Sequence, residues 1–235
     1  MKTIGLIGGM SWESTQHYYQ LINQTVKQRL GGLHSAKVVL VSVDFAPVEA
    51  LQRKGDWQAA GEILVTAAKQ LEAAGADFVL ICTNTMHIIV KQVQQAISIP
   101  IIHIADATGD YIVANGYKRI ALLGTAFTME QTFYKQRLQE KYQLEIITPN
   151  ATQRREVHRI IYEELCLGEI KPDSQSYYLN VLSDLKNNHG AQATILGCTE
   201  IGLLVKQSMC DFPLIDTTNM HAIAAVDRAL AQQLP

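Results

Sequence analysis

The sequence has little of several features that mark special classes of protein. Four cysteines in 235 residues are too few for a disulfide scaffold. Its 20 Lys and Arg nearly balance 22 Asp and Glu, which excludes a broadly basic nucleic-acid surface and a polybasic membrane anchor. No run of the ~20 apolar residues needed for a membrane span occurs. The first apolar run, Ile4 to Met10, is rich in glycine and soon meets Glu13, unlike a signal peptide. We expect a cytoplasmic protein with reduced thiols and no nucleic-acid or membrane partner.

Several ligand-binding motifs are also missing. There is no GxGxxG for a dinucleotide and no Gly-Lys-Ser/Thr for a P-loop. Cys82, His87 and Cys198 could be considered as zinc ligands, but no CxxC or HExxH spacing supports that alternative. The sequence therefore gives no positive indication of a metal or a nucleotide.

What is present is an alternation of short apolar runs and longer helical patterns. Apolar residues make up 48% of the chain, which is normal for a globular protein. Continuous apolar strands separated by helices indicate a parallel sheet covered on both faces. The first half is expected to form strands over 2–8, 38–43, 77–82 and 99–104, and helices over 12–30, 56–74 and 86–96.

The second half repeats the first. The matching pairs are 2–9 with 118–125 and 78–83 with 194–199, both at an offset of 116, and 99–102 with 212–215 at an offset of 113. Three matches in order indicate a duplication. The predicted fold is α/β, with two similar three-layer lobes, each built on a parallel sheet, related by an approximate two-fold axis.

The expected lobes are residues 1–105 plus 212–235, and residues 106–211. The C-terminal helix, Met220–Leu234, is expected to pack back on the first lobe. Parallel sheets bind ligands at the carboxyl ends of their strands, so a cleft between the lobes is the expected site.

Three polar turns follow predicted strands. Gly8–Ser11 is either an anion cradle at a helix N-terminus or an ordinary tight turn. Cys82–His87 and Gly197–Glu200 are equivalent strand ends by the repeat, each before a helix whose N-terminus would favour a thiolate. The alternative for any cysteine is a buried apolar filler. That alternative is adopted for Cys166 and Cys210, whereas the polar neighbours of Cys198 favour a function.

The histidines are scattered. His87 is expected to order the turn that precedes it, and His103 and His221 are expected to be structural.

Two proton-transfer groups on opposite sides of a ligand can invert a carbon centre. One removes a proton while the other delivers one to the opposite face. Thiols suit this task because their pKa of about 8.5 can be brought towards neutrality.

These residues resemble the aspartate/glutamate racemase family, which needs no pyridoxal phosphate. The resemblance covers essentially the whole chain and rests on Ile4–Met10, Asn84–His87 and Gly197–Glu200. The opening Gly-Gly-Met-Ser-Trp-Glu-Ser-Thr is similar to the enterobacterial branch specific for L-aspartate and L-glutamate. The family implies two α/β lobes, a cleft site, a homodimer, two catalytic cysteines and no metal or organic cofactor.

The sequence departs from the family motif Cys-Asn-Thr-Ala-His. Aligned on Asn84, Thr85 and His87, the family cysteine falls on Thr83, and Cys82 lies one residue earlier. Adjacent strand residues point to opposite faces, so Cys82 would then point into packing. The repeat offset of 116 instead leads from Cys198 to Cys82. We favour the motif register, because the repeat offset drifts between 113 and 116.

The resemblance implies roles for further residues. Cys198 would be the base for the L-enantiomer, with Thr83 opposing it directly or through a water. The expected substrate-binding residues are Met10, Gln52, Asn84, Thr85, Thr128, Thr199 and Glu200.

Recognition of a substrate side-chain carboxylate is less well specified. Cys166 stands in the stretch where aspartate racemases of the family can carry a lysine. Arg53 offers a fork suited to a carboxylate or belongs to a solvated basic loop. Thr125 and Thr128 line the second lobe's side of the site or cap a helix.

The sequence thus predicts a cofactor-independent racemase of L-aspartate or L-glutamate. Two alternatives stay open. One is another enzyme of the same superfamily, such as a broad-specificity amino-acid racemase or a decarboxylase. The other is a catalytically impaired two-lobed protein that binds amino acids.

Overall fold

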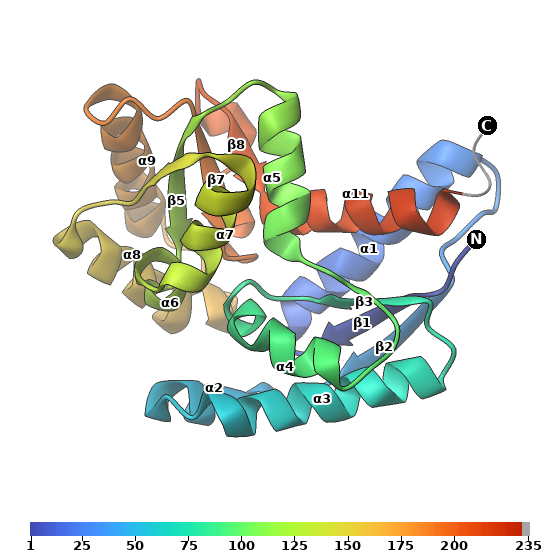
Figure 1. The fold of residues 1–235 in the computed structure, drawn as a ribbon. Coiled ribbons are helices and arrows are strands. Elements are labelled where there is room, and N and C mark those ends of the chain that lie inside the picture. The colour runs from blue at the N-terminus through green and yellow to red at the C-terminus, as the bar shows by residue number, and fades with distance from the viewer. Residues whose placement is uncertain (232–235) are drawn as a thin grey trace. The chain divides into compact units, whose positions relative to one another are not determined.

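The computed structural model describes residues 1–231 and forms two compact units (Figure 1). The first unit is Met1–Ile104 together with the segment that starts at Thr218, and the second is Ala105–Thr217. Each is an α/β unit built on its own four-stranded parallel sheet. Within residues 1–231, no helix is both long and apolar enough to cross a membrane.

The first unit has the strand order β2-β1-β3-β4. Its elements are β1 (Ile4–Gly8), α1 (Trp12–Leu30), β2 (Val38–Ser42), α2 (Phe45–Lys54), α3 (Trp57–Ala73), β3 (Phe78–Ile81), the 3-10 helix η1 (Thr85–Ile89), α4 (Val90–Gln95), β4 (Ile101–Ile102) and α11 (Thr217–Leu230). Figure 1 shows α2 and α3 on one side of this sheet and α1 and α11 on the other.

Both faces of the first sheet are buried. Ile7 and Val79 pack into an apolar cluster with α3, whereas Leu6 and Leu80 pack on the opposite face with α1 and α11. Adjacent side chains of a strand point to opposite faces, so a continuous apolar run is what a sheet covered on both sides requires. This explains why the strands could be located from sequence.

The second unit has the corresponding order β6-β5-β7-β8. Its elements are α5 (Ile104–Ala114), β5 (Arg119–Gly124), α6 (Ala126–Glu130), α7 (Thr132–Tyr142), β6 (Glu145–Ile147), α8 (Ala151–Glu163), the 3-10 helix η2 (Leu165–Leu167), α9 (Pro172–Asn187), β7 (Ala193–Gly197), α10 (Ile201–Leu204), the 3-10 helix η3 (Gln207–Met209) and β8 (Leu214–Asp216). The shared strand order confirms the two similar α/β units predicted from the repeat.

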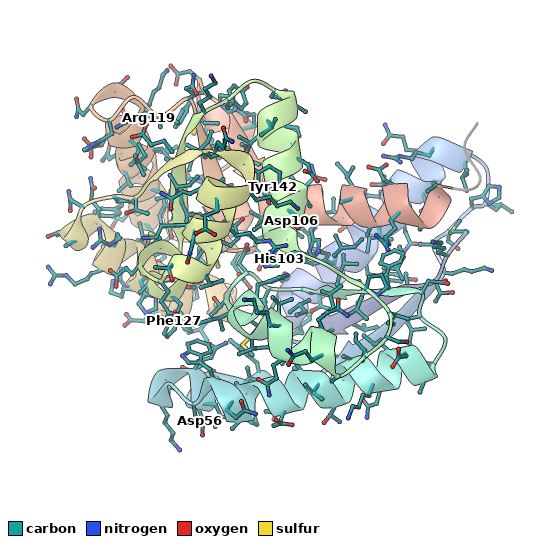
Figure 2. All side chains as sticks on the ribbon, viewed as in Figure 1. Asp56, His103, Asp106, Arg119, Phe127 and Tyr142 are labelled. Atoms are coloured by element: carbon teal, nitrogen blue, oxygen red, sulfur yellow. The ribbon has the colours of Figure 1, made fainter. Side chains whose placement is uncertain are left out.

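Polar contacts join α5 to α7 in the second unit. The guanidinium of Arg137 donates to both carboxylate oxygens of Asp106, at 2.6 and 2.7 Å, and the Tyr142 hydroxyl donates to the Asp106 carbonyl at 3.1 Å. Figure 2 labels Asp106 and Tyr142. The two nearby cations Arg137 and Lys141 outweigh partial burial and hold the pKa of Asp106 below its usual range.

The predicted boundary near residue 212 is wrong. Leu214–Asp216 forms β8, which pairs with β7 in the second sheet, so the chain returns to the first unit only between Thr217 and Thr218. The 212–215 segment already matched 99–102, which is the last strand of the first sheet, and the same logic places β8 in the second sheet. The predicted C-terminal helix is α11, which packs on the first unit as expected; residues 232–234 of that prediction lie outside the described residues.

The sequence also missed α2. The basic-loop alternative for Arg53 does not hold, because Arg53 lies in the last turn of α2, and the next residue after that helix, Gly55, is its C-cap in the left-handed conformation. Asp56, labelled in Figure 2, then caps α3 by accepting from the Ala59 N–H at 3.1 Å. Pro47 falls in the first turn of α2, where proline is tolerated.

The Gly8-Gly9 turn is explained by close packing. A Cβ on Gly9, whose φ is +93°, would lie 2.1 Å from the Val43 carbonyl oxygen, and one on Gly8 would lie 2.3 Å from the Thr15 methyl. The Gly9 N–H donates to the Thr15 hydroxyl at 2.8 Å. These contacts support the tight-turn interpretation of the two glycines.

Candidate functional site

The residues after β3 divide between the core and a polar turn. Cys82 is fully buried in the apolar cluster beneath α1 and α11, and burial raises the pKa of its thiol well above the usual range. Thr83 is only half-buried. The structure therefore places the Cys82 side chain in packing, as the motif register predicted.

The pairing register of the two sheets relates Thr83, and not Cys82, to Cys198. Ile4 pairs with Phe78 in the first sheet. In the second sheet Ile120, which is Ile4 shifted by 116, pairs with Ala193, which is Phe78 shifted by 115. An offset of 115 carries Thr83 to Cys198. The two residues thus occupy equivalent positions. Thr83 lies two residues beyond Ile81, which pairs with Ile7, and Cys198 lies two residues beyond Leu196, which makes the equivalent pair with Leu123. The sequence offset of 116 is therefore wrong by one residue at this point.

Cys198 is part of a short hydrogen-bonded group after β7. Its Sγ donates to Oε2 of Glu200 at 2.9 Å, and the Thr199 hydroxyl donates to the same oxygen at 2.7 Å. All three side chains are buried or nearly so, with Glu200 only 4% exposed. Glu200 is one of the expected substrate-binding residues, and in the structure its carboxylate accepts from the Cys198 thiol, two positions away in the same turn.

The thiol of Cys198 is not activated in the way the sequence suggested. Burial, the Glu200 carboxylate and the neighbouring Cys166 raise the pKa of Cys198 well above its usual range. The helix that follows, α10, has only four residues, so its dipole offers little to a thiolate. Cys198 is consequently a neutral thiol whose proton points at a carboxylate.

The other expected residues of the first unit lie around the turn after β3 and α2. Asn84 and Thr85 are 2% and 6% exposed at the start of η1. Gln52 is also buried, and its amide donates to Sδ of Met86 at 3.1 Å. Met10 packs in the same apolar cluster as Met86. These contacts bring Gln52 beside η1, the helix that Asn84 and Thr85 begin.

The two candidates for a side-chain carboxylate partner have defined surroundings. The Arg53 guanidinium pairs with Glu49 one turn earlier at 2.6 Å, with its side chain 76% exposed. Cys166 packs, partly buried, against the core cluster that contains Cys198. Cys166, which the family resemblance sets at the lysine position, thus lies against the same cluster as Cys198.

Thr125 and Thr128 form a helix cap. Thr125 is the N-cap of α6 and accepts from the Thr128 N–H at 3.3 Å, and the two hydroxyls lie 3.2 Å apart. Thr128 is fully buried, and a Cβ built on Gly197 would lie 3.2 Å from its methyl. The cap interpretation holds for Thr125, and Thr128 packs beside the residue that precedes Cys198.

Three buried histidines, His87, His103 and His221, form a cluster in the first unit, and one of them contacts Thr83. His87 bonds to the Thr83 carbonyl, and its ring centroid lies 4.5 Å from that of His103 and 6.0 Å from that of His221. His221 in turn bonds to the Tyr18 hydroxyl and to the Ile102 carbonyl, both at 2.9 Å. Even so, residues 1–231 contain no group of three His, Cys, Asp or Glu side chains arranged to hold a metal ion.

His221 should make the first unit sensitive to mild acid. Burial, then the nearby His87, lower the pKa of His221 to about 3, against about 6.5 in an unfolded chain. As the pH falls below 6.5, the unfolded chain gains a proton that the folded one does not, so stability is lost. Between pH 7 and pH 5 the unsubstituted protein should lose about 2 kcal/mol more than His221→Gln.

Urea unfolding followed by tryptophan fluorescence measures this difference, because both tryptophans, Trp12 and Trp57, lie in the first unit. His34→Gln, at an exposed position, serves as the matched control and should show the unsubstituted pH dependence. Equal losses in His221→Gln and the unsubstituted protein would contradict the prediction.

Comparisons with known proteins agree with the fold and the motifs. A family model described as Asp/Glu/Hydantoin racemase matches residues 7–225. A solved Yersinia pestis structure, provisionally assigned as an Asp/Glu racemase, is 54% identical, with 98% of this chain and 100% of that chain covered and a TM-score of 0.91. An aspartate racemase homologue from Pyrococcus horikoshii OT3 is 33% identical, with 97% and 99% covered and a TM-score of 0.85. The broad specificity amino-acid racemase RacX of Bacillus subtilis (strain 168) is 23% identical over 233 residues, 98% of this chain and 99% of its own.

Proposed function

Because the chain belongs to the Asp/Glu/Hydantoin racemase family, we propose that it inverts the α-carbon of acidic amino acids, with Thr83 and Cys198 as the two proton-transfer groups. The observation that supports this pair is the register, which makes the two residues equivalent in the two sheets. A duplicated fold offers its ligand two equivalent strand ends, and inversion needs one group for each face of the carbon.

The proposed reaction begins with the neutral thiol. Glu200 takes the proton of Cys198 along the 2.9 Å hydrogen bond, and the resulting thiolate removes the α-proton of the L-substrate. The carbon then takes a proton on its other face from the Thr83 hydroxyl, directly or through a water, and solvent restores that proton. Glu200 releases to solvent the proton that it took from Cys198, so one proton enters and one leaves in each turnover. In reverse, Cys198 gives the proton back to the L-face.

The remaining expected residues would bind the substrate. Asn84, Thr85 and Thr199 would hold the α-carboxylate with polar groups of their turns, and preorganised donors of this kind stabilise the carbanion-like transition state. Met10, Gln52 and Thr128 would shape the pocket. The proposal uses no metal or pyridoxal phosphate, and it includes a cytoplasmic homodimer, as the family resemblance implies.

The relatives and the residues near the site bear on the choice of substrate. The Yersinia relative is assigned as an Asp/Glu racemase and the Pyrococcus relative is described as an aspartate racemase homologue. Both descriptions support an acidic substrate. A broad-specificity racemase is the second candidate, favoured by the match to RacX and by a cysteine, Cys166, in the stretch where the family resemblance expects a lysine. Arg53 would have to leave Glu49 to bind a side-chain carboxylate.

Hydrogen exchange at the α-carbon tests the proposal. A threonine hydroxyl is a far weaker acid than a thiol, so Thr83 should be a poor base. L-aspartate or L-glutamate should therefore exchange its α-hydrogen with D₂O faster than the D-product accumulates, and the D-enantiomer should exchange slowly. Thr83→Cys should bring the two exchange rates closer.

Proton NMR in D₂O and chiral chromatography on the same samples, over a panel of amino acids, give both rates. Exchange confined to acidic amino acids supports the specific racemase, and exchange across the panel supports the broad one. A protein that only binds amino acids would show no exchange. Equal exchange from L and D, matching the rate of inversion, would refute the asymmetric pair.

A further inference from the structure

Two buried histidines bond to the segment where the chain leaves the first unit. After β4 the first unit ends at Ile104. Nε2 of His87 accepts from the Ile104 N–H at 3.2 Å, and Nε2 of His221 donates to the Ile102 carbonyl at 2.9 Å. His103, labelled in Figure 2, lies between these two bonded residues in the chain. The segment 102–104 is therefore held by side chains from η1 and α11.

The partners of each ring fix a single neutral tautomer. A carbonyl can only accept and a main-chain N–H can only donate. His87 therefore carries its proton on Nδ1, which donates to the Thr83 carbonyl at 2.8 Å, and leaves Nε2 bare for Ile104. His221 has the opposite tautomer, with its proton on Nε2 and Nδ1 accepting from the Tyr18 hydroxyl.

His87 thus bridges two main-chain groups that no regular element joins. Thr83 lies in the bend between β3 and η1, and Ile104 lies beyond β4. The imidazole is 2% exposed, so water has little opportunity to replace either bond. A rigid ring bonded at both ends sets where the Thr83 main chain lies relative to Ile104.

We propose that His87 is a positioning residue for racemization, whose neutral ring fixes the Thr83 main chain against the segment that ends the first unit. The inference rests on the proposed role of Thr83. A hydroxyl that delivers a proton must lie near the attack geometry, and a misplacement of about 1 Å can cost up to about 10²-fold in rate. Both of these bonds are to main-chain groups, so we assign His87 no direct part in proton transfer.

Two substitutions separate the two bonds of the ring. His87→Asn keeps a donor at the place of Nδ1 and loses the acceptor for Ile104. His87→Gln reaches the place of Nε2, where its carbonyl accepts from Ile104, and loses the donor to Thr83. Because each substitution removes one of the two bonds that hold the Thr83 main chain against Ile104, we expect kcat for inversion to fall about tenfold or more in both variants, with KM for the L-substrate nearly unchanged. His34→Gln is the surface control.

The tautomer supplies a readout independent of activity. Nitrogen-15 NMR of the unsubstituted protein should show a protonated Nδ1 and a bare Nε2 for His87, with the reverse for His221. A protonated Nε2 or a cationic ring at His87 would overturn the proposal, even if every variant failed to fold.

The kinetics of the two variants also test the positioning role of His87. Full kcat in either variant would overturn the positioning role in an enzyme that remains active, because each variant lacks one of the two bonds. Failure of the proposed function is distinguishable, because the unsubstituted protein would then show no α-hydrogen exchange at all.

Discussion

Replacing Cys198 by alanine should lower kcat/KM for inversion by about 10³-fold or more while the protein still folds. A positioned acid or base contributes about 10²–10⁴-fold, and in the proposed reaction Cys198 is both the base for the L-substrate and the acid for the D-substrate. The free energies of two enantiomers in water are equal, so the values of kcat/KM in the two directions must fall together. Chiral chromatography from each enantiomer measures the loss.

Cys82→Ala is the matched control for this substitution. Cys82 is a buried thiol in the core of the first unit, and its loss should cost about 1–2 kcal/mol of stability with most activity kept. Full activity in Cys198→Ala would contradict the proposed mechanism. Collapse of activity in folded Cys82→Ala, with Thr83→Ala unaffected, would show instead that Cys82 is the second group.

The strands were predictable because they are buried on both faces. Runs such as Phe78–Ile81 are apolar at every position, and the similar run Ala193–Gly197 recurs in the second half. Apolar repeats, however, are tolerant of a one-residue shift, since neighbouring residues in such a strand have the same character. The difference between Cys82 and Thr83 depends on that shift, and only hydrogen-bond pairing determines it.

The electrostatics of the site were less predictable. The turn before a helix suggested a lowered thiol pKa at Cys198, but the helix has a single turn and Glu200 accepts from the thiol. The length of α10 and the contact between Glu200 and the thiol both depend on the backbone conformation after β7, which the residue types alone do not determine. The same holds for His87, whose two partners are separated from each other by 21 positions, from Thr83 to Ile104.

Glu200→Gln should separate the two effects that Glu200 has on the thiol. The carboxylate raises the pKa of Cys198, which by itself opposes formation of a thiolate. The same carboxylate can also take the thiol proton, because Oε2 of Glu200 lies 2.9 Å from Sγ of Cys198. Glutamine keeps the size of the side chain, removes the charge and cannot serve as the base. We expect kcat/KM to fall about 10²–10³-fold while the pKa of Cys198 falls as well.

Alkylation of Cys198 by iodoacetamide measures the second effect, because the thiolate is the reacting species. At a fixed pH near 8, peptide mass spectrometry should find faster alkylation of Cys198 in Glu200→Gln than in the unsubstituted protein, although the variant is the poorer enzyme. Glu163→Gln, which removes an exposed carboxylate that pairs with Arg159 in the same unit, should change neither rate. If Glu200 served only to keep the thiol protonated, its removal would instead raise alkylation and racemization together, and that result would exclude Glu200 as the group that accepts the proton of Cys198.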